Sequence, residues 1–454
     1  MISPIDPYAN TPVYLLHSYY LLVTVGAFFV YLKHHYRNRL ALFTILIFWQ
    51  GLFTHLDTIV SGSNNAYKVI IFFYALHLFA INIDKKRFKH DFYINLCFFL
   101  FSVSFWISFI INKPPLITTF SQFGFKYGIP FLLYHGLKDI DRDEEKKTRL
   151  FDILYNIILL QIAFSVAKLL ILGQKEAIVG SIQHSGGGSA VFLPLLSMIL
   201  IWLMHGGVIE KKDNLIFLFL LMISVISGKR ATIILMPIYY FAITLFKGNK
   251  LRFAKALKYI PLVLLLFFLG VKLTPALNIE RSYWGSFDVN YVVDYALKYN
   301  FGTKDIGTLA EGQTGRGASL QLIFQSQRLN LHNMAEKLFG KGIDTTALQK
   351  RGRFLGGAAY GIDHMGLIGA AVMIIYALGY FGFIFMFLFC LSLLFVIKNI
   401  KFRIVIITMF LYDFFLYGNI LLFHNSLAFL TLFICLASNT VQLSKKTSMA
   451  PYKQ

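Results

Sequence analysis

Two adjacent cations stand between two strongly apolar runs in this chain and are the first candidates for chemistry. The motif is "ISGKRA", in which Lys229 and Arg230 interrupt the apolar sequence. Arginine stays charged and its planar guanidinium grips a phosphate or carboxylate at two points, whereas lysine adds a point charge. We therefore expect Arg230 to bind an anion such as a pyrophosphate, with Lys229 as a secondary contact. The alternative is that both side chains reach from a helix end to water at a membrane surface.

Further arginines lie later in the chain. The stretch "EGQTGRGASLQLIFQSQRL" places Arg316 at the start of an expected helix, after a glycine-rich turn. A cation at a helix N-terminus opposes the helix dipole, which indicates a bound anion or a specific role. Arg328 lies on the same stretch, where a solvated position is its alternative, and Arg351 and Arg353 follow in "QKRGRF". These three are candidate substrate-binding residues.

Two histidines complete the candidate set. His364 precedes an apolar run, and a histidine there is suited to act as a general base at neutral pH if it reaches an acceptor hydroxyl. His184 lies in the glycine-rich "GSIQHSGGGSAVF", where backbone N–H groups are able to approach an anion. That segment lacks the Gly-Lys-Ser/Thr ending of a P-loop, so a surface turn is its alternative.

The sequence indicates no metal and no cofactor. It contains neither a D-x-D pair nor H-E-x-x-H. Its three cysteines lie in apolar segments without C-x-x-C spacing, which is typical of small buried hydrophobic residues.

The elements that must position these residues are membrane helices. Of the 454 residues, 57% are hydrophobic and 14% charged, against about 25% charged in ordinary soluble chains. Runs of this apolar length cross a bilayer as helices, so we predict an all-α polytopic membrane protein. About thirteen spans are expected, near 14–32, 40–60, 68–83, 92–111, 116–136, 151–172, 189–204, 214–227, 231–246, 259–275, 362–397, 404–420 and 424–440.

The distribution of basic residues predicts the orientation. Alternate loops carry 25 Lys and Arg on one side, and the short loops on the other side carry 5. Because cytoplasmic loops retain positive charge, the C-terminus is predicted inside and the N-terminus outside, with "ISGKRA" on the outer face. The net charge of +21 thus reflects membrane topology, and no nucleic-acid partner is expected.

Three regions follow from this topology. Residues 1–275 hold the first ten spans, 276–361 form one long external loop, and 362–454 hold the last three spans and a cytoplasmic tail. A loop of this length is predicted to be a folded cap that carries function. Within it, "NYVVDYALKYN" and "GASLQLIFQSQRLNLHNMAEKLF" are each spaced for an amphipathic helix.

Taken together, these features resemble a known superfamily. The order of "FSQFGFKYGIPFLLYHGL", "SGKRA", "TGRGASLQL", "LFGKG" and "HMGLIGAAVMIIYALGYFG", with a late external loop, is similar to that of bacterial O-antigen polymerases and O-antigen ligases. The resemblance covers most of the chain from about residue 120. It implies a GT-C-like, metal-independent, inverting glycosyltransferase of the bacterial inner membrane, with a helical periplasmic loop.

The resemblance also implies a substrate and residue roles. The donor would be an undecaprenyl-pyrophosphate-linked oligosaccharide, and the product a lipopolysaccharide O-antigen, a capsule or an exopolysaccharide. Arg230 and Arg316 match the family's pyrophosphate-binding arginines, and a chain-length regulator protein is the implied partner. Developing negative charge on a departing pyrophosphate is what preorganised arginines stabilise without a metal.

Two alternatives stay open. In ligases, which transfer the glycan to a lipid A core, a His followed by Asn or Ser lies closer to a G-x-x-G motif than His364 lies to Gly379. Met365 also departs from that pattern, so polymerase is preferred. A polysaccharide or anionic-lipid transporter would use intramembrane charges such as His55, Asp57, Lys126 or Lys168, but it predicts repeated halves, and no repeat is evident in the sequence.

Overall fold

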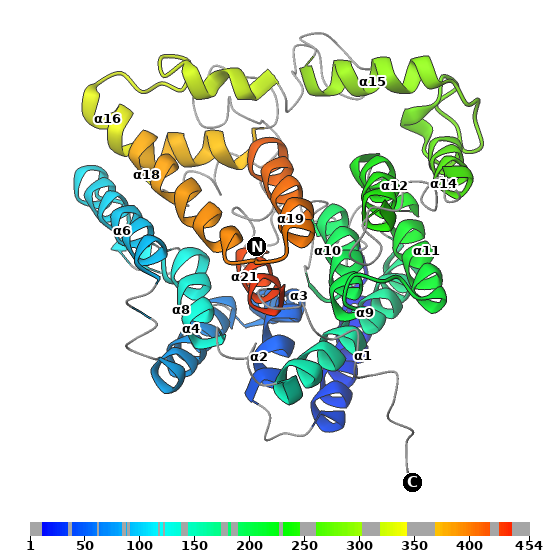
Figure 1. The fold of residues 1–454 in the computed structure, drawn as a ribbon, viewed down its shortest axis with the longest axis horizontal. Helices are drawn as coiled ribbons and strands as arrows, with labels where there is room; N and C mark the ends of the chain where they lie inside the picture. The colour runs from blue at the N-terminus through cyan, green and yellow to red at the C-terminus, as the bar shows by residue number, and fades with distance from the viewer. Residues whose placement is uncertain are drawn as a thin grey trace.

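The computed structural model describes residues 11–34, 39–60, 63–83, 88, 91–116, 119–120, 123–137, 144–173, 180–182, 189–226, 230–245, 260–301, 318–342, 368–417 and 426–437. Within these ranges the protein is helical and contains no β-strand, as Figure 1 shows. Every one of the predicted apolar runs contains helix, so the all-α prediction is confirmed for the described chain.

The helices of the bundle are α1 (Val13–Lys33), α2 (Arg39–Phe48), α3 (Gln50–Ile59), α4 (Ser63–Asn82), α6 (Phe92–Asn112), η1 (Phe123–Gly128), α8 (Ile129–Leu137), α9 (Glu144–Leu172), α10 (Ser189–Met204), α11 (Lys211–Ile226), α12 (Arg230–Leu245), α14 (Ile260–Leu273), α18 (Ala370–Phe395), α19 (Ile400–Tyr412), η7 (Asp413–Tyr417) and α21 (Ser426–Ala437). The segment predicted to form the cap contributes η4 (Pro275–Leu277), α15 (Val289–Phe301), η5 (Ala318–Phe324) and α16 (Met334–Phe339).

Four helices in the described chain are long and apolar enough to cross a membrane by themselves. They are α1, α6, α18 and residues Glu145–Leu172 of α9. Their outward faces carry large apolar side chains: Leu170 is 78% exposed and Ile110 is 67% exposed. Apolar residues on the outside of a bundle are suited to contact with lipid. These features indicate a membrane-embedded helical protein.

The helices pack into one continuous apolar core. Helix α18 lies against α6, and α4 lies against α8, while α21 lies between α8 and α10 (Figure 1). A neighbouring group is formed by α10, α11, α12 and α14, in which α12 contacts each of the other three. Trp202 of α10 and Phe389 of α18, both fully buried, belong to the same core cluster.

Two predicted spans are interrupted by a break in the helix. The run 40–60 divides into α2 and α3 at Trp49, whose indole Nε1 donates to the Val23 carbonyl of α1 at 2.9 Å. Helix α18 is broken at Gly379, which has φ 70° and ψ −175°. Figure 1 shows α18 as two stretches at an angle, of which residues 370–378 are the first. In that stretch Ala370, Val372 and Ile375 are fully buried.

The cap confirms one of its two predicted helices and corrects the other. Helix α15 covers the first pattern and lies across the end of the bundle, above α12 and α14 (Figure 1). The prediction of one long helix over 317–339 is wrong, since the chain forms η5, a turn and the short α16. Asn330 has φ 61° in that turn, and Asn333 starts α16 by accepting the Glu336 backbone N–H. Buried Leu322, Leu329 and Leu331 meet the core without a common helix face.

Candidate functional site

Most of the predicted site residues lie outside the described part of the chain. These are Lys229, Arg316, His364, Arg351, Arg353 and His184. Arg230 is the first residue of α12, and its backbone is described although its side chain is not. Arg328 is described fully: it is half-buried, and its guanidinium donates to the Gln325 side chain at 3.0 Å.

Helix α12 packs against α14, which leads through η4 into α15. With the predicted topology, Arg230 at the start of α12 and the cap lie on the same side of the membrane. Helix α10 also packs against α12 and begins there, at Ser189, directly after the glycine-rich segment. Two adjacent helix N-termini carry partial positive charge and unpaired N–H groups, which favours an anion at this end.

A buried carboxylate near the start of α18 was missed by the sequence prediction. Helix α18 begins at Ala370, with Gly369 preceding it, and it packs against η7. Gly369 lies so close to η7 that a Cβ there would be 2.2 Å from the Phe415 carbonyl oxygen. Asp413, the first residue of η7, is fully buried. The signal was available in the sequence, because a single acidic residue in an apolar run often marks function.

The cap is fixed to the break in α18 by close backbone contact. Gly340 and Gly379 both have positive φ, and a Cβ on Gly340 would lie 2.4 Å from the Ala377 carbonyl carbon. The backbone N–H groups of Lys341 and Gly342 donate to the Tyr376 and Ala377 carbonyls, each at 2.9 Å. These hydrogen bonds cap the first stretch of α18, whose last carbonyls are otherwise unpaired at the break.

Side chains from α6 and α18 strengthen this joint. Asn112 Nδ2 donates to the Gly340 carbonyl at 3.1 Å and to the Ser108 carbonyl at 2.9 Å. The Tyr380 hydroxyl donates to the Ile323 carbonyl of η5 at 2.8 Å. The cap segment that follows Arg316 in the chain is thus held to the bundle at two places.

Two of the residues named above for a transporter, His55 and Lys168, lie among aromatic side chains of α1. His55 of α3 lies 3.2 Å from the His17 ring nitrogen and stacks on Tyr20. Lys168 of α9 is fully buried, with its Nζ 5.7 Å from the Tyr19 ring centre. Nearby, Gln161 and Ser181 hydrogen-bond to each other at 2.7 Å. This pair and the bond from the Tyr19 hydroxyl to the Gly180 carbonyl fix the start of the glycine-rich segment.

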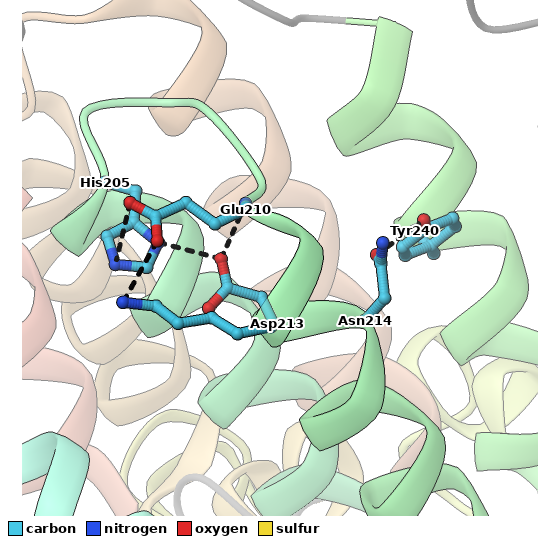
Figure 2. A network of polar contacts seen from close by, with 6 residues as sticks. His205, Glu210, Asp213, Asn214 and Tyr240 are labelled. Atoms are coloured by element: carbon cyan, nitrogen blue, oxygen red, sulfur yellow. Dashed lines mark hydrogen bonds and ion pairs between the residues drawn. The ribbon is translucent and has the colours of Figure 1, made fainter.

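A polar network at the start of α11 is built like a helix cap (Figure 2). Asp213 Oδ2 accepts from the Glu210 backbone N–H and lies 2.8 Å from His205 Nδ1. A hydrogen bond to the Glu210 side chain raises the pKa of Lys212. A carboxylate three residues into a helix that reaches back to the preceding N–H is half of a capping box, so a structural role accounts for this network. In the described chain, no group of His, Cys, Asp and Glu is arranged to hold a metal ion.

An apolar cavity of about 290 Å³ lies between α10, α11 and α12. It is lined by Met198, Asn214, Leu215, Phe217, Leu218, Leu221, Met236, Pro237 and Tyr240. Its polar lining consists of Asn214 and Tyr240. The Tyr240 hydroxyl donates to the Asn214 side chain at 2.9 Å (Figure 2). Met236 lies six residues after Arg230, so about 9 Å of helix separates the cavity from the start of α12.

Compared with known proteins, the chain matches no family model, no curated protein and no solved structure.

Proposed function

We propose that this protein polymerises surface polysaccharide by transferring an undecaprenyl-pyrophosphate-linked glycan to a sugar hydroxyl at the outer face of the bacterial inner membrane. The observation that carries the proposal is the position of Arg230 at the start of α12, a helix that packs against α14, which leads into the cap. A cation here, between helix N-termini and beneath a cap, is suited to a lipid pyrophosphate. The proposal includes about thirteen spans in a GT-C-like arrangement, with the N-terminus outside.

In this account the arginines stabilise the leaving group. Arg230 and Arg316 hold the pyrophosphate and stabilise the negative charge that grows as its bond to the anomeric carbon breaks. The acceptor hydroxyl oxygen attacks that carbon from the opposite face, and configuration is inverted. Lys229, Arg328, Arg351, Arg353 and His184 are proposed as further contacts to the anionic donor.

The acceptor hydroxyl must lose its proton during the attack. We propose His364 or Asp413 as the group that takes it, since His364 precedes α18 by six residues in the sequence and Asp413 belongs to η7, which packs against α18. Asp413 is fully buried, and a positioned carboxylate is one of the groups that serve as a general base. A chain-length regulator is the proposed protein partner.

The apolar cavity below Arg230 supports a lipid-linked donor. Its lining is apolar except at the Asn214–Tyr240 pair, and it lies along the same helix as Arg230. An isoprenoid chain that extends into the bilayer from a pyrophosphate at Arg230 would meet this cavity about 9 Å along α12. Burial of the isoprenoid chain in this cavity would contribute roughly 25 cal/mol of binding free energy per Å² of apolar surface removed from water.

The test is an assay of the purified protein in liposomes with lipid-linked repeat units as the only glycan. Elongated lipid-linked products support the polymerase. Transfer only after addition of a lipid A core would instead identify a ligase. Movement of the lipid-linked glycan across the liposome membrane, without a new glycosidic bond, would contradict a transferase and favour transport.

A further inference from the structure

The part of the cap that follows α14 exposes an unusual amount of apolar surface. Six large apolar side chains within residues 279–297 are more than half exposed: Ile279 (55%), Tyr283 (64%), Trp284 (60%), Val289 (51%), Val293 (51%) and Leu297 (56%). Exposed apolar residues that occur singly need no explanation, but a contiguous patch marks a surface that binds something. We call these six residues the apolar rim.

Three members of the apolar rim form one face of α15. Val289, Val293 and Leu297 are spaced by four residues and therefore lie in a row along the helix. Another face of α15 is already occupied, since Val292 and Tyr295 are buried against the end of α14 and η4. The exposed row is thus a second apolar face, beyond the one that holds α15 to the bundle.

Trp284 connects the apolar rim to the end of α14. Its backbone N–H donates to the Lys272 carbonyl at 2.7 Å, and Lys272 Nζ lies 5.5 Å from the indole ring centre and 5.4 Å from the Phe268 ring centre. One to two turns earlier, Leu264 and Leu265 of α14 are 59% and 51% exposed, as expected for side chains that face lipid. The indole is therefore fixed where an apolar helix surface ends.

We propose that the apolar rim lies in the headgroup region of the outer leaflet, so that α15 is an interfacial helix and Trp284 an interfacial anchor. Three observations favour lipid as the occupant. The rim follows directly after α14, whose Leu264 and Leu265 are exposed, Trp and Tyr are the residues that prefer the membrane interface, and α15 lies across the direction of α12 and α14 (Figure 1). Exposed Glu280 and Arg281 supply the polar edge that such a segment needs.

This position has a consequence for the cap. The segment enters the bilayer surface on one side, while Gly340 and Gly342 fix the other side of the cap to α18. The cap is then held at the level of lipid headgroups, which is where the pyrophosphate of a membrane lipid lies. The interfacial position itself does not depend on the proposed transferase activity.

The experiment labels single cysteines on two faces of α15 in the full-length protein. Val293→Cys lies on the apolar rim. Asp294→Cys is the matched control, since this exposed polar residue is next in the chain and lies about 100° farther around the helix. Each variant carries an environment-sensitive fluorophore and is reconstituted into vesicles of zwitterionic and anionic phospholipids. Some vesicles contain lipids with bromine near the headgroup end of the acyl chains, and others contain bromine near the methyl end.

We expect quenching at Val293→Cys by bromine near the headgroup to be at least roughly twofold stronger than at Asp294→Cys, and stronger than quenching by bromine near the methyl end. Equal and weak quenching at both positions, with ready quenching by aqueous iodide, would overturn the proposal. Shielding from iodide that grows with the protein-to-lipid ratio would also overturn it, because it would identify a second copy of the chain as the occupant.

A second measurement uses the native tryptophan and needs no cysteine. The difference in emission between the unmodified protein and Trp284→Phe reports the environment of Trp284 alone. We expect this difference signal to be quenched by bromine near the headgroup. Quenching of this difference signal by aqueous iodide, without quenching by brominated lipids, would contradict the interfacial anchor.

Discussion

Gly379 of α18 lies directly against the backbone of Leu338 in α16: a Cβ on Gly379 would be 2.2 Å from the Leu338 carbonyl carbon. The two residues belong to segments on either side of the 343–367 stretch, which holds Arg351, Arg353 and His364. The contact therefore fixes the start of that stretch beside the break in α18, while its end joins the start of α18, about 14 Å of helix before the break. The break in α18 is the place where the cap is joined to it.

The first prediction concerns this joint. Gly379→Ala should lower the free energy of unfolding by about 3 kcal/mol, because the new methyl group overlaps backbone atoms that cannot move independently. Gly173→Ala is the matched control, since Gly173 has a similar φ of 65° but nothing within 4 Å of its Cβ position. That control should cost only about 1 kcal/mol, from the left-handed conformation. Thermal unfolding in detergent measures both, and equal losses would refute the close contact.

The second prediction concerns the apolar cavity. Leu218→Trp should narrow it and raise KM for the lipid-linked donor several-fold, with little change in stability, because Leu218 lines the cavity yet is 42% exposed. Phe219→Trp is the matched control: the neighbouring side chain is 43% exposed but does not line the cavity. Initial rates at varied donor concentration give the comparison. An unchanged KM in Leu218→Trp would remove the cavity from the donor site.

The third prediction is a pH dependence in the cap. The His332 backbone N–H donates to the Glu336 carboxylate at 2.8 Å and lowers the pKa of Glu336 below its ordinary value of 4.5. A lowered pKa in the folded state means that the carboxylate contributes stability above pH 4.5 and loses that contribution as the pH falls through the folded value. The unmodified protein should therefore lose stability in acid relative to Glu336→Gln.

Melting temperatures between about pH 6 and pH 3 test this prediction. Asn333→Ala is the control, because it removes the bond from the Glu336 backbone N–H but keeps the carboxylate. It should lower stability by about 1 kcal/mol at every pH without changing the pH dependence. Identical pH curves for the unmodified protein and Glu336→Gln would show that the carboxylate is not held as described.

The fourth prediction concerns Asp413. If this buried carboxylate takes the acceptor proton, Asp413→Asn should slow transfer by about a hundredfold while the protein still elutes as a monodisperse species. Asp152→Asn, on the exposed face of α9, is the matched control and should be close to unmodified activity. Normal turnover by Asp413→Asn would leave His364 as the remaining candidate base.

The sequence predicted the helices well because apolar runs of this length have few other folds available in a membrane. The expected start of the span at residue 231 differs by one residue from the observed start of α12 at Arg230. The breaks at Trp49 and Gly379 were not predicted. Each depends on a contact distant in the sequence: Trp49 bonds to Val23, and Gly379 meets Leu338.

In the cap, hydrophobic periodicity did not predict the secondary structure correctly. Its 317–339 pattern suits a helix, yet the buried leucines there are equally well placed by η5, a turn and α16. Periodicity alone does not distinguish these arrangements, because the turn depends on the left-handed Asn330. In the candidate site, the charge of Arg230 in an apolar run predicted a functional role. Asp413 is also a charged residue in an apolar run, but it was not predicted. The predicted roles of Arg316 and His364 lie outside the described residues and stay predictions.

The most direct test of the central claim is a comparison of Arg230→Ala with Lys229→Ala in the liposome elongation assay. The account predicts that Arg230→Ala, although folded and inserted, makes no long chains, whereas Lys229→Ala keeps most of the activity. Arg149→Ala, which alters an exposed arginine on α9, is the control for loss of charge alone. Near-normal chain-length ladders from Arg230→Ala would contradict the account.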